Sequence, residues 1–234
     1  MTTTKRAFFQ GLRDSAPFII VVGPFALLFG VLATEAGLTV TQSIGFSVGV
    51  IAGASQFAAV QLIQDGAPIF IILATALAVN LRMAMYSASL APHLAGIPLW
   101  KRAVMSYLLV DQSYALGLNR YESNPQMGKS ARVSYFLGTM SFIAPIWYGA
   151  TVIGAVFGSQ IPPEYALDFA VPITFLALIG PMLKTAAHMA AAFTSIVLAL
   201  VLAFIPYNLG LIIAAVCAMM VGAQIELMQQ RWQK

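Results

Sequence analysis

The sequence predicts an all-α, polytopic membrane protein built as a helix bundle, and three observations lead to that prediction. Hydrophobic residues make up 60% of the 234 residues and charged residues only 9%, whereas soluble domains carry about 25% charged residues. The apolar residues fall in runs long enough to cross a hydrocarbon core of about 30 Å, which takes roughly 20 residues of helix. The basic residues lie mostly beside these runs, which is typical of the cytoplasmic rim of a membrane protein.

Eight apolar stretches are candidate membrane spans, and we expect some of them to be broken or re-entrant. The longest gap between them, residues 119–133, is too short for an aqueous domain. We therefore expect one integral membrane domain over residues 1–234. The stretches are Ala16–Ala33, Thr41–Ile63, Pro68–Leu90, Ala103–Leu118, Ser134–Phe157, Tyr165–Leu183, Thr185–Ile205 and Asn208–Leu227.

The distribution of lysine and arginine predicts that both termini are cytoplasmic. If all eight stretches cross the membrane, nine basic residues lie inside and two outside, and Arg82 lies within a span. This split follows the rule that cytoplasmic loops carry an excess of Lys and Arg. Lys101 and Arg102 are the two exceptions, and a re-entrant early segment would explain them.

The composition also argues against several classes of function. One cysteine, Cys217, gives neither a disulfide nor a thiolate cluster, and two histidines, His93 and His188, disfavour a zinc site. The sequence holds no Walker A pattern, so the chain is not itself an ATPase motor. We therefore expect no cofactor, no metal and no nucleic-acid partner.

Glycines recur every four residues in the second apolar stretch. Gly45, Gly49 and Gly53 would lie on one face of a straight helix, where a second helix could approach closely. Pure helix packing is one interpretation of this spacing. The alternative is that the glycines belong to a functional element, because a polar segment follows them directly.

Two segments are candidate helix breaks. Gly53-Ala54-Ser55-Gln56 is polar and lies in the middle of an apolar stretch, and Gly180-Pro181 lies near the end of another. Irregular backbone at membrane depth persists only where it is buried in protein or lines a cavity. Interrupted segments at matching places in two halves of a chain indicate a transporter's binding site.

A weak internal similarity predicts a repeat. A shift of 124 residues aligns Gly30 with Gly154 and also places Gln56 on Gly180. The two halves would be residues 16–92 and 134–205. Chance similarity between apolar helices is the alternative.

Two opposite charges lie deep in consecutive spans. A central arginine costs about 2.5–3.5 kcal/mol on insertion scales, so Arg82 needs a partner or water. Asp111 is the carboxylate deep in the next stretch, and it shares a predicted helix face with Tyr107 and Tyr114, as Arg82 does with Tyr86. We expect the two polar faces to meet, either as a static ion pair or as a substrate or proton site.

His188 is a second candidate for proton coupling, together with Asp111. The pKa of a histidine lies near physiological pH, so it could relay protons. The alternative is a neutral histidine that is hydrogen-bonded to a neighbouring carbonyl group.

Several short motifs in this chain resemble those of a known family. They are GASQFAAV at 53–60, Asn80-Leu81-Arg82 followed by Tyr86 and SLAP at 89–92, DQSYA at 111–115, and LDFAVP at 167–172 followed by FLAL at 175–178. The chain resembles the AzlC-type branched-chain amino acid permeases over about Gly11 to Pro181. It departs from their pattern at Val110, where Thr is usual, and at Gln112, where Glu is usual. The second departure removes a carboxylate and puts ion coupling at that position in doubt.

The resemblance implies a transporter of the bacterial cytoplasmic (inner) membrane that exports branched-chain amino acids. The substrates would be leucine, isoleucine and valine, with methionine as a further candidate. It also implies a small AzlD-like membrane subunit as partner. We expect contact with such a partner to lie within the bilayer, through small residues such as Gly154 and Gly158.

The leading hypothesis is therefore a secondary transporter of small amino acids, and not an enzyme. Arg82 could hold the substrate carboxylate, and Asp111 could pair with its ammonium group or carry a coupling proton. One alternative is an intramembrane hydrolase with Ser55 as nucleophile and His188 as base, and another is a non-transporting scaffold or channel subunit. The candidate substrate-binding residues are Ser55, Gln56, Asn80, Arg82, Tyr86 and Asp111.

Overall fold

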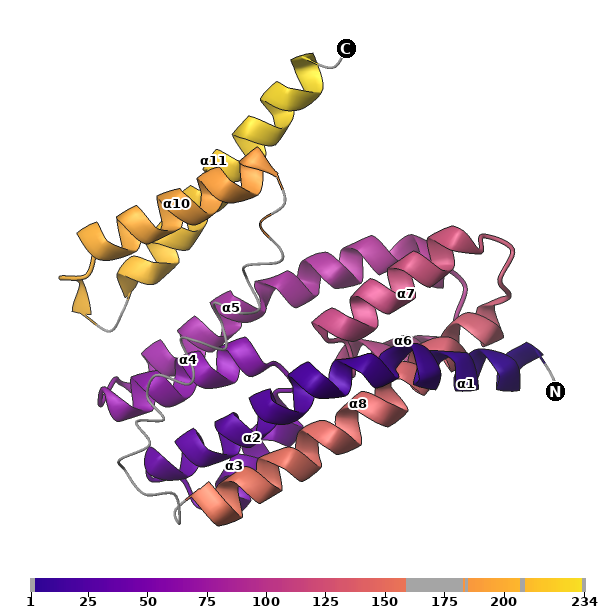
Figure 1. Ribbon diagram of the computed structural model, residues 1–234, viewed down its shortest axis with the longest axis horizontal. Helices are drawn as coiled ribbons and strands as arrows, with labels where there is room; N and C mark the ends of the chain where they lie inside the picture. The colour runs from indigo at the N-terminus through magenta and orange to yellow at the C-terminus, as the bar shows by residue number, and fades with distance from the viewer. Residues whose placement is uncertain (1–2, 159–182, 184, 207–208, 233–234) are drawn as a thin grey trace. The chain divides into compact units, whose positions relative to one another are not determined.

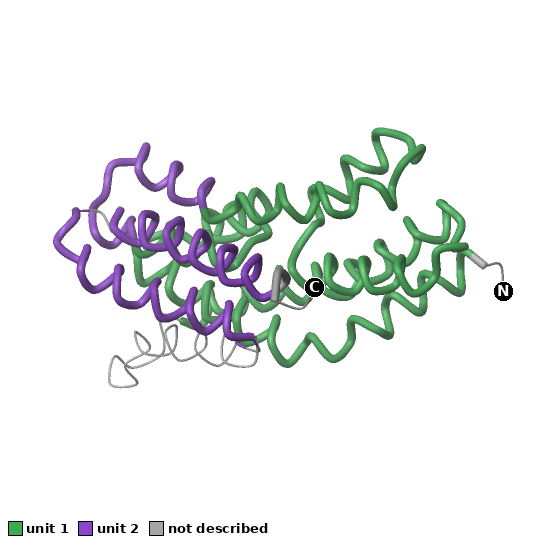
Figure 2. Tube along the Cα trace, turned by 90° about the horizontal axis from the view of Figure 1, so that it is seen from above, with its two compact units in different colours: residues 1–61, 79–162 green, residues 62–78, 163–234 purple. Residues whose placement is uncertain are grey.

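The computed structural model describes residues 3–158, 183, 185–206 and 209–232, and their regular secondary structure is helical throughout (Figure 1). The prediction of an all-α fold is thus confirmed. Gly180, Pro181 and much of the second predicted repeat half lie outside the described residues. The chain divides into two compact units, one of residues 1–61 and 79–162 and one of residues 62–78 and 163–234 (Figure 2).

Long apolar helices form the frame of unit 1, the unit of residues 1–61 and 79–162. Helix α1 (Thr3–Ser15) continues through the 3-10 turn η1 (Ala16–Phe18) into α2 (Ile19–Glu35). Pro17 lies in the first positions of that turn, where its missing N–H costs nothing. Helix α8 (Lys129–Phe157) runs beside this rod (Figure 1).

The continuous helical segment of α1, η1 and α2 runs parallel to α8. Glycines let the two backbones touch near both ends of this contact. The backbone of Phe8 lies against Gly138, and the backbone of Leu27 lies against Gly154. A side chain at any of these glycines would collide with main-chain atoms, which cannot move aside. Gly30 and Gly154, which the predicted repeat aligns, lie at the same crossing.

The second apolar stretch, Thr41–Ile63, was expected to be a span and instead folds back on itself. It forms α3 (Val40–Gly49) and α4 (Gly53–Gln64), and Val50 between them is extended, with φ −137° and ψ 95°. The Gln56 side-chain amide donates to the Ser47 hydroxyl at 3.0 Å. In one straight helix these residues would lie about 13.5 Å apart along the axis. The break lies at residues 50–52, so the prediction that Gly53 breaks the helix misplaces it, and Gly53 begins α4.

The fourth stretch, Ala103–Leu118, is also a hairpin rather than a span. Its two helices are α6 (Leu99–Tyr107) and α7 (Asp111–Ser123). Val110 between them is extended, with φ −130° and ψ 168°. The Arg132 guanidinium donates to the carbonyls of His93, before α6, and Pro125, after α7, at 2.7 and 2.8 Å. Both ends of the hairpin therefore lie together at the start of α8.

Helix α5 (Ile69–Leu90) ends in the 3-10 turn η2 (Ala91–Leu94) and lies beside α7 (Figure 1). Contacts between this segment and α7 join residues that follow one another in the same order in both. Tyr86 stacks on Tyr114, and further on His93 lies beside Tyr121. The two helices are therefore parallel.

In the other unit, α10 (Ala186–Val201) and α11 (Leu209–Trp232) form an antiparallel pair. Gly222 of α11 faces Ala191, and Gly210 faces Leu202. Much of the remaining surface of this pair is apolar and exposed, including Phe193, which suits a membrane protein.

The prediction of a polytopic membrane helix bundle with broken segments is confirmed. Within the described residues, four helices are long and apolar enough to cross a membrane: Thr4–Glu35, Ile69–Leu94, Lys129–Phe157 and Leu209–Gln229. Helix α10 is apolar but shorter. The sixth predicted span, Tyr165–Leu183, lies almost wholly outside the described residues.

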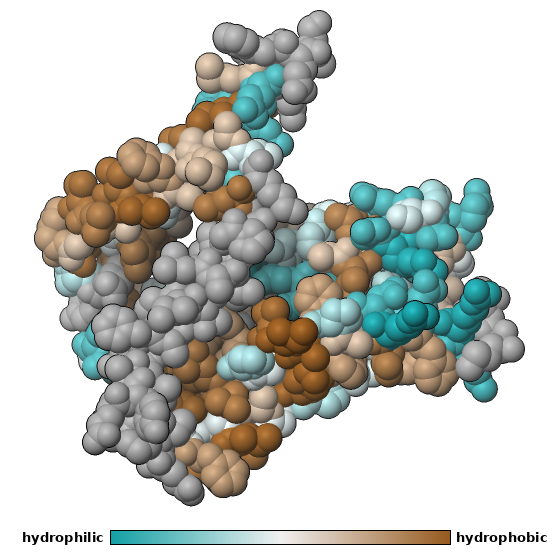
Figure 3. Space-filling view, in the orientation of Figure 1, coloured by the Kyte–Doolittle hydropathy of each residue, from teal (hydrophilic) through white to brown (hydrophobic). Residues whose placement is uncertain are grey.

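The hairpin of α3 and α4 explains the two exceptions in the charge distribution. Lys101 and Arg102 lie in the first turn of α6, at the end of unit 1 where α1 and α8 begin. Figure 3 shows hydrophilic residues gathered at that end of unit 1 and hydrophobic residues over much of the rest. Because α3 and α4 fold back, only α2 and α5 run between α1 and α6, so Lys101 and Arg102 share the side of the basic residues of α1.

Candidate substrate site at two broken helices

The two hairpins enter unit 1 from opposite ends, and their tips meet. Helix α3 begins where α2 ends, whereas α6 begins at the end where α8 starts. The Tyr107 hydroxyl donates to the Val48 carbonyl at 2.6 Å and lies 3.4 Å from the Tyr148 hydroxyl. The Val48 carbonyl is in the last turn of α3 and has no partner within its helix. Tyr107 thus satisfies a main-chain group that the break leaves open.

An ion pair lies beside the tip of the second hairpin. Arg82 Nη1 and Asp111 Oδ2 are 2.9 Å apart, as the expectation that the two polar faces meet requires. Asp111 is the first residue of α7, where the helix dipole favours a negative charge. Tyr107 does not share a helix face with Asp111 as expected, because residues 108–110 interrupt the helix.

Each partner in this ion pair keeps an unused polar atom. Arg82 Nε and Asp111 Oδ1 are both buried and have no hydrogen-bond partner among the described residues. The side chains as a whole are 29% and 43% exposed, so the pair is open on one side. The pair therefore keeps one unused donor and one unused acceptor.

Two tyrosines stand beside the ion pair. Tyr86 stacks on Tyr114 with 4.1 Å between ring centroids and 10° between planes. The Tyr114 hydroxyl donates to the Ser89 hydroxyl at 3.1 Å. Tyr86 lies within electrostatic reach of both Arg82 and Asp111. The structure thus brings three of the predicted site residues together: Arg82, Tyr86 and Asp111.

Asn80 does not join this group. It lies two residues before Arg82 on α5, and two residues turn a helix by about 200°, so the two side chains leave on different faces. The Asn80 side-chain oxygen is buried without a partner.

Ser55 and Gln56 belong to a second polar cluster, at the first hairpin. Gln56 donates to Ser47, whose hydroxyl lies 3.3 Å from the Thr151 hydroxyl on α8. Ser55, Gln56, Ser47 and Thr151 are at most 1% exposed. The Gln56 side-chain oxygen has no hydrogen-bond partner within the residues that the structure describes. Sequence reasoning missed Ser47 and Thr151, because single hydroxyls in apolar helices are common.

The glycine stripe of the second stretch does not form a packing face in this structure. A Cβ atom at Gly45 or Gly49 would meet nothing within 4 Å. At Gly53 it would lie 2.7 Å from the Phe25 ring and 2.9 Å from the Trp147 ring. Only Gly53 is therefore tightly packed, and it packs against aromatic side chains rather than a helix backbone.

The remaining predicted site residues are placed elsewhere. His188 lies in the first turn of α10, in the other unit, where its backbone N–H is capped by the Thr185 hydroxyl at 3.2 Å. The Ser55 hydroxyl, the nucleophile of the hydrolase alternative, donates to the Ala52 carbonyl at 2.9 Å. Ser55 and His188 thus belong to different units of the chain.

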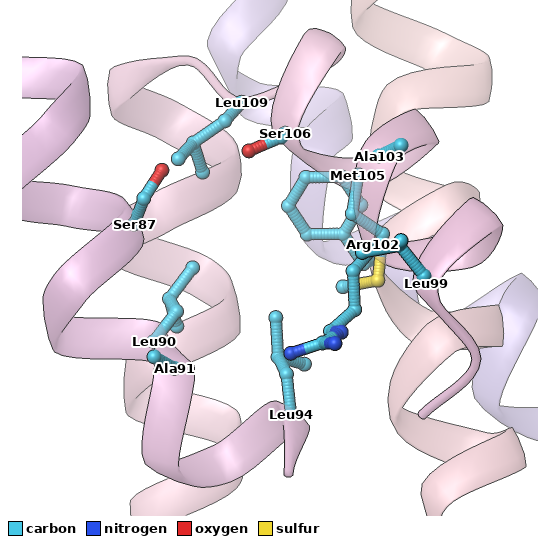
Figure 4. Close-up of a pocket in the computed structure, with 11 residues that line it drawn as sticks. Ser87, Leu90, Ala91, Leu94, Leu99, Arg102, Ala103, Met105, Ser106 and Leu109 are labelled. Atoms are coloured by element: carbon cyan, nitrogen blue, oxygen red, sulfur yellow. The ribbon is translucent and has the colours of Figure 1, made fainter. Parts of the chain in front are cut away.

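A cavity of about 290 Å³ lies between α5, α6 and α8 (Figure 4). Its wall is mostly aliphatic, and it also includes Arg102, Ser87 and Ser106. It extends from the first turn of α6 to Leu109 in the break. The sequence analysis considered Arg102 only as an exception to the predicted topology. That exception was the signal that could have identified Arg102 as a cavity residue.

Comparison with known proteins gives a consistent picture. Residues 17–161 match the family described as AzlC protein. The chain is 29% identical to the inner membrane protein YgaZ of Escherichia coli K12 over 178 residues, which is 74% of this chain and 71% of that protein. It is 30% identical to an uncharacterized membrane protein of Archaeoglobus fulgidus over 77% of this chain and 78% of the other. A Helicobacter pylori membrane protein is 26% identical over 83% and 85%. No solved structure matches.

Proposed function

The chain belongs to the AzlC family of membrane proteins, and we propose that it is a secondary transporter that exports small amino acids, above all leucine, isoleucine and valine. Amino acid transport is consistent with the family as a whole. The choice of branched-chain substrates, with methionine as a further candidate, and the direction of transport are parts of the proposal. We propose a transport role without catalysis.

The observation that carries this proposal is the half-open ion pair at the tip of a broken helix. An amino acid is a zwitterion, so its site needs a donor for the carboxylate and an acceptor for the ammonium group. Arg82 Nε and Asp111 Oδ1 have no hydrogen-bond partner among the described residues, and they belong to the two side chains of one ion pair. A guanidinium group can bind a carboxylate through two parallel hydrogen bonds.

The broken helices supply further groups at the same depth. Helices α4 and α7 both begin at a break, and their first N–H groups have no partner within the helix. Half-helix ends of this kind bind charged groups in secondary transporters. Ser55 and Gln56 lie in the first turn of α4, which supports a role for them in the same site.

The apolar side chain of the substrate needs a separate surface. Phe57 packs edge-on against Phe25 and Phe29 and belongs to the core. The cavity beside α6 is lined mainly by aliphatic residues such as Leu90 and Leu109. We assign the branched side chain to this cavity, whose volume is that of a small-ligand pocket.

We place the chain in the cytoplasmic membrane of a bacterium, with the end of unit 1 where α1 begins on the cytoplasmic side. The clustering of Arg6, Arg102, Arg120 and Arg132 at that end supports this orientation. A cytoplasmic C-terminus remains a prediction, which rests on Arg231 and Lys234.

A small AzlD-like membrane subunit is the proposed partner. Gly154 and Gly158, the residues expected to make that contact, are buried against Leu27 and Val31 of α2. We therefore assign the partner contact to other membrane-facing surface of the chain.

Counterflow in proteoliposomes tests the proposal. Vesicles loaded with unlabelled leucine should accumulate labelled leucine, valine and methionine transiently, but not labelled glutamate. The assay is run with and without the small subunit, because the partner is part of the proposal. Absence of counterflow for all three apolar amino acids, with the subunit present and the protein folded, would contradict it.

A further inference from the structure

A cleft of about 600 Å³ opens at the end of unit 1 where α1 begins. One wall is α1, with Arg6 and Gln10, and the other is the end of α7, with Arg120, followed by the loop to α8. A second cavity of about 350 Å³ shares Arg6 and Gln10 and continues along α1 to Arg13. Arg6 lines both cavities, with Arg120 in the first and Arg13 in the second, and we call the two neighbouring cavities together the groove.

Arg120 is fixed in this groove and is not neutralised. Its Nη2 donates to the Gln10 side-chain oxygen at 2.6 Å, and its guanidinium lies 5.7 Å from the centre of the Tyr135 ring. Its Nε is buried and has no hydrogen-bond partner in the described part of the chain. The Asp14 carboxylate lines the outer cavity, but it accepts the Tyr135 hydroxyl at 2.9 Å. None of the three arginines forms an ion pair with a described residue.

The face of α1 that lines the groove combines cationic and aromatic side chains. Arg6, Phe9, Gln10 and Arg13 follow the spacing of one helix face, so an aromatic ring stands between two cations. Phe9 is 54% exposed. Exposed phenylalanine among arginines is typical of helices that lie at the boundary between lipid headgroups and acyl chains.

We propose that this groove binds the phosphate group of an anionic phospholipid. Arg6 and Arg120 would donate to the phosphate oxygens, and Phe9 would contact the upper part of the acyl chains. The start of α8 adds to the site, because Gly128 lines the cleft and its helix has no side-chain cap.

A lipid fits better than free phosphate, because the groove combines cations with an exposed ring at the rim of a membrane domain. Basic pockets on the cytoplasmic side of membrane proteins bind anionic headgroups. The inference rests on the proposed orientation, which brings this end of unit 1 to the cytoplasmic leaflet. It does not rest on transport activity.

Native mass spectrometry of the purified full-length chain tests the proposal. The protein in mild detergent is titrated with phosphatidylglycerol, with phosphatidylcholine, or with inorganic phosphate. We expect a one-to-one adduct with phosphatidylglycerol at several-fold lower lipid concentration than with phosphatidylcholine. Equal retention of the two lipids would overturn the proposal, and an adduct with inorganic phosphate at the same concentration would identify a free-anion site instead.

Matched variants locate the adduct. Arg6→Gln should weaken phosphatidylglycerol binding about fivefold, since each basic residue near an anionic surface contributes about that factor. Lys5→Gln removes the same charge from the neighbouring exposed residue, which does not line the groove, and should leave binding unchanged. Equal losses in both variants would show a non-specific charge effect and refute the site.

Arg120→Gln provides a second measurement, with a check on folding, because Arg120 also contacts α1 and Tyr135. We expect weaker phosphatidylglycerol binding at unchanged secondary structure. Since binding is read without transport, failure of the lipid site and failure of the proposed transport function give different results.

Discussion

Replacing Arg82 and Asp111, singly and together, separates a substrate site from a structural ion pair. Their contact of 2.9 Å joins the middle of α5 to the first residue of α7. Asp111→Leu leaves an uncompensated arginine, which costs about 2.5–3.5 kcal/mol at the centre of a span. Both side chains are partly exposed, so we expect the lower end of that range.

The two single variants should not be equal. Arg82→Leu leaves the carboxylate at the start of α7, where the helix dipole returns about 0.3–1 kcal/mol. Asp111→Leu leaves the arginine in the middle of α5, without such compensation. We therefore expect Asp111→Leu to be the less stable of the two, by about two- to fivefold in the ratio of folded to unfolded protein.

The double variant, Arg82→Leu with Asp111→Leu, removes both charges and should recover most of the stability. Thermal stability by size-exclusion chromatography and leucine counterflow are measured on the same preparations. We expect a folded protein that does not transport, with Lys101→Leu as a control for the loss of one charge outside the site. Leucine counterflow by the double variant at the rate of the unaltered protein would refute the substrate role and show that the ion pair is structural.

Further predictions concern the hairpins. Gly53→Leu should lower the free energy of unfolding by about 1–3 kcal/mol and reduce transport, because Phe25 and Trp147 already fill the space. Gly45→Leu, which meets open space, is the matched control. Equal shifts in thermal stability for the two variants would disprove the packing argument. Tyr107→Phe removes the donor to the Val48 carbonyl, so we expect a loss of about 0.5–1.5 kcal/mol and altered transport, and unchanged values in both assays would count against contact between the tips. In a Cys217→Ser background, Lys101→Cys should react with an impermeant thiol reagent only from the cytoplasm, and labelling from the periplasm would rule out the α3–α4 hairpin in its proposed orientation.

The contact between Arg82 and Asp111 could be predicted from the sequence, because each charge needs a compensating partner. Each is an ionisable residue deep in an apolar stretch, and an uncompensated charge there is costly. The class of fold follows in the same way from the lengths of the apolar stretches. The role of the pair in binding a substrate remains a prediction.

The two hairpins could not be predicted with confidence from hydropathy, because their breaks are apolar. Residues 50–52 are Val-Ile-Ala and residues 108–110 are Leu-Leu-Val, which read as continuations of a span. Valine accepts extended backbone readily, so neither glycine nor proline is needed at Val50 or Val110. The useful signals were indirect: the charges at Lys101 and Arg102, and the short length of the fourth stretch.

Glycine spacing misled the sequence analysis in one place and helped in another. The stripe of Gly45, Gly49 and Gly53 does not form one face, because the helix ends at Gly49. By contrast, Gly30 and Gly154 do lie at a close helix crossing, where main chain touches main chain. The spacing alone does not tell these cases apart, since it assumes that the helix continues.

Protection of the hairpin tips by substrate tests the central claim most directly. Gly49→Cys at the end of α3 and Gln112→Cys beside Asp111 are each made in the Cys217→Ser background, with Lys5→Cys as a control on α1. The account predicts that leucine slows maleimide labelling at both tip positions, that glutamate does not, and that Lys5→Cys reacts at the same rate throughout. Labelling of both tips at rates independent of leucine, in protein that still carries out leucine counterflow, would contradict it.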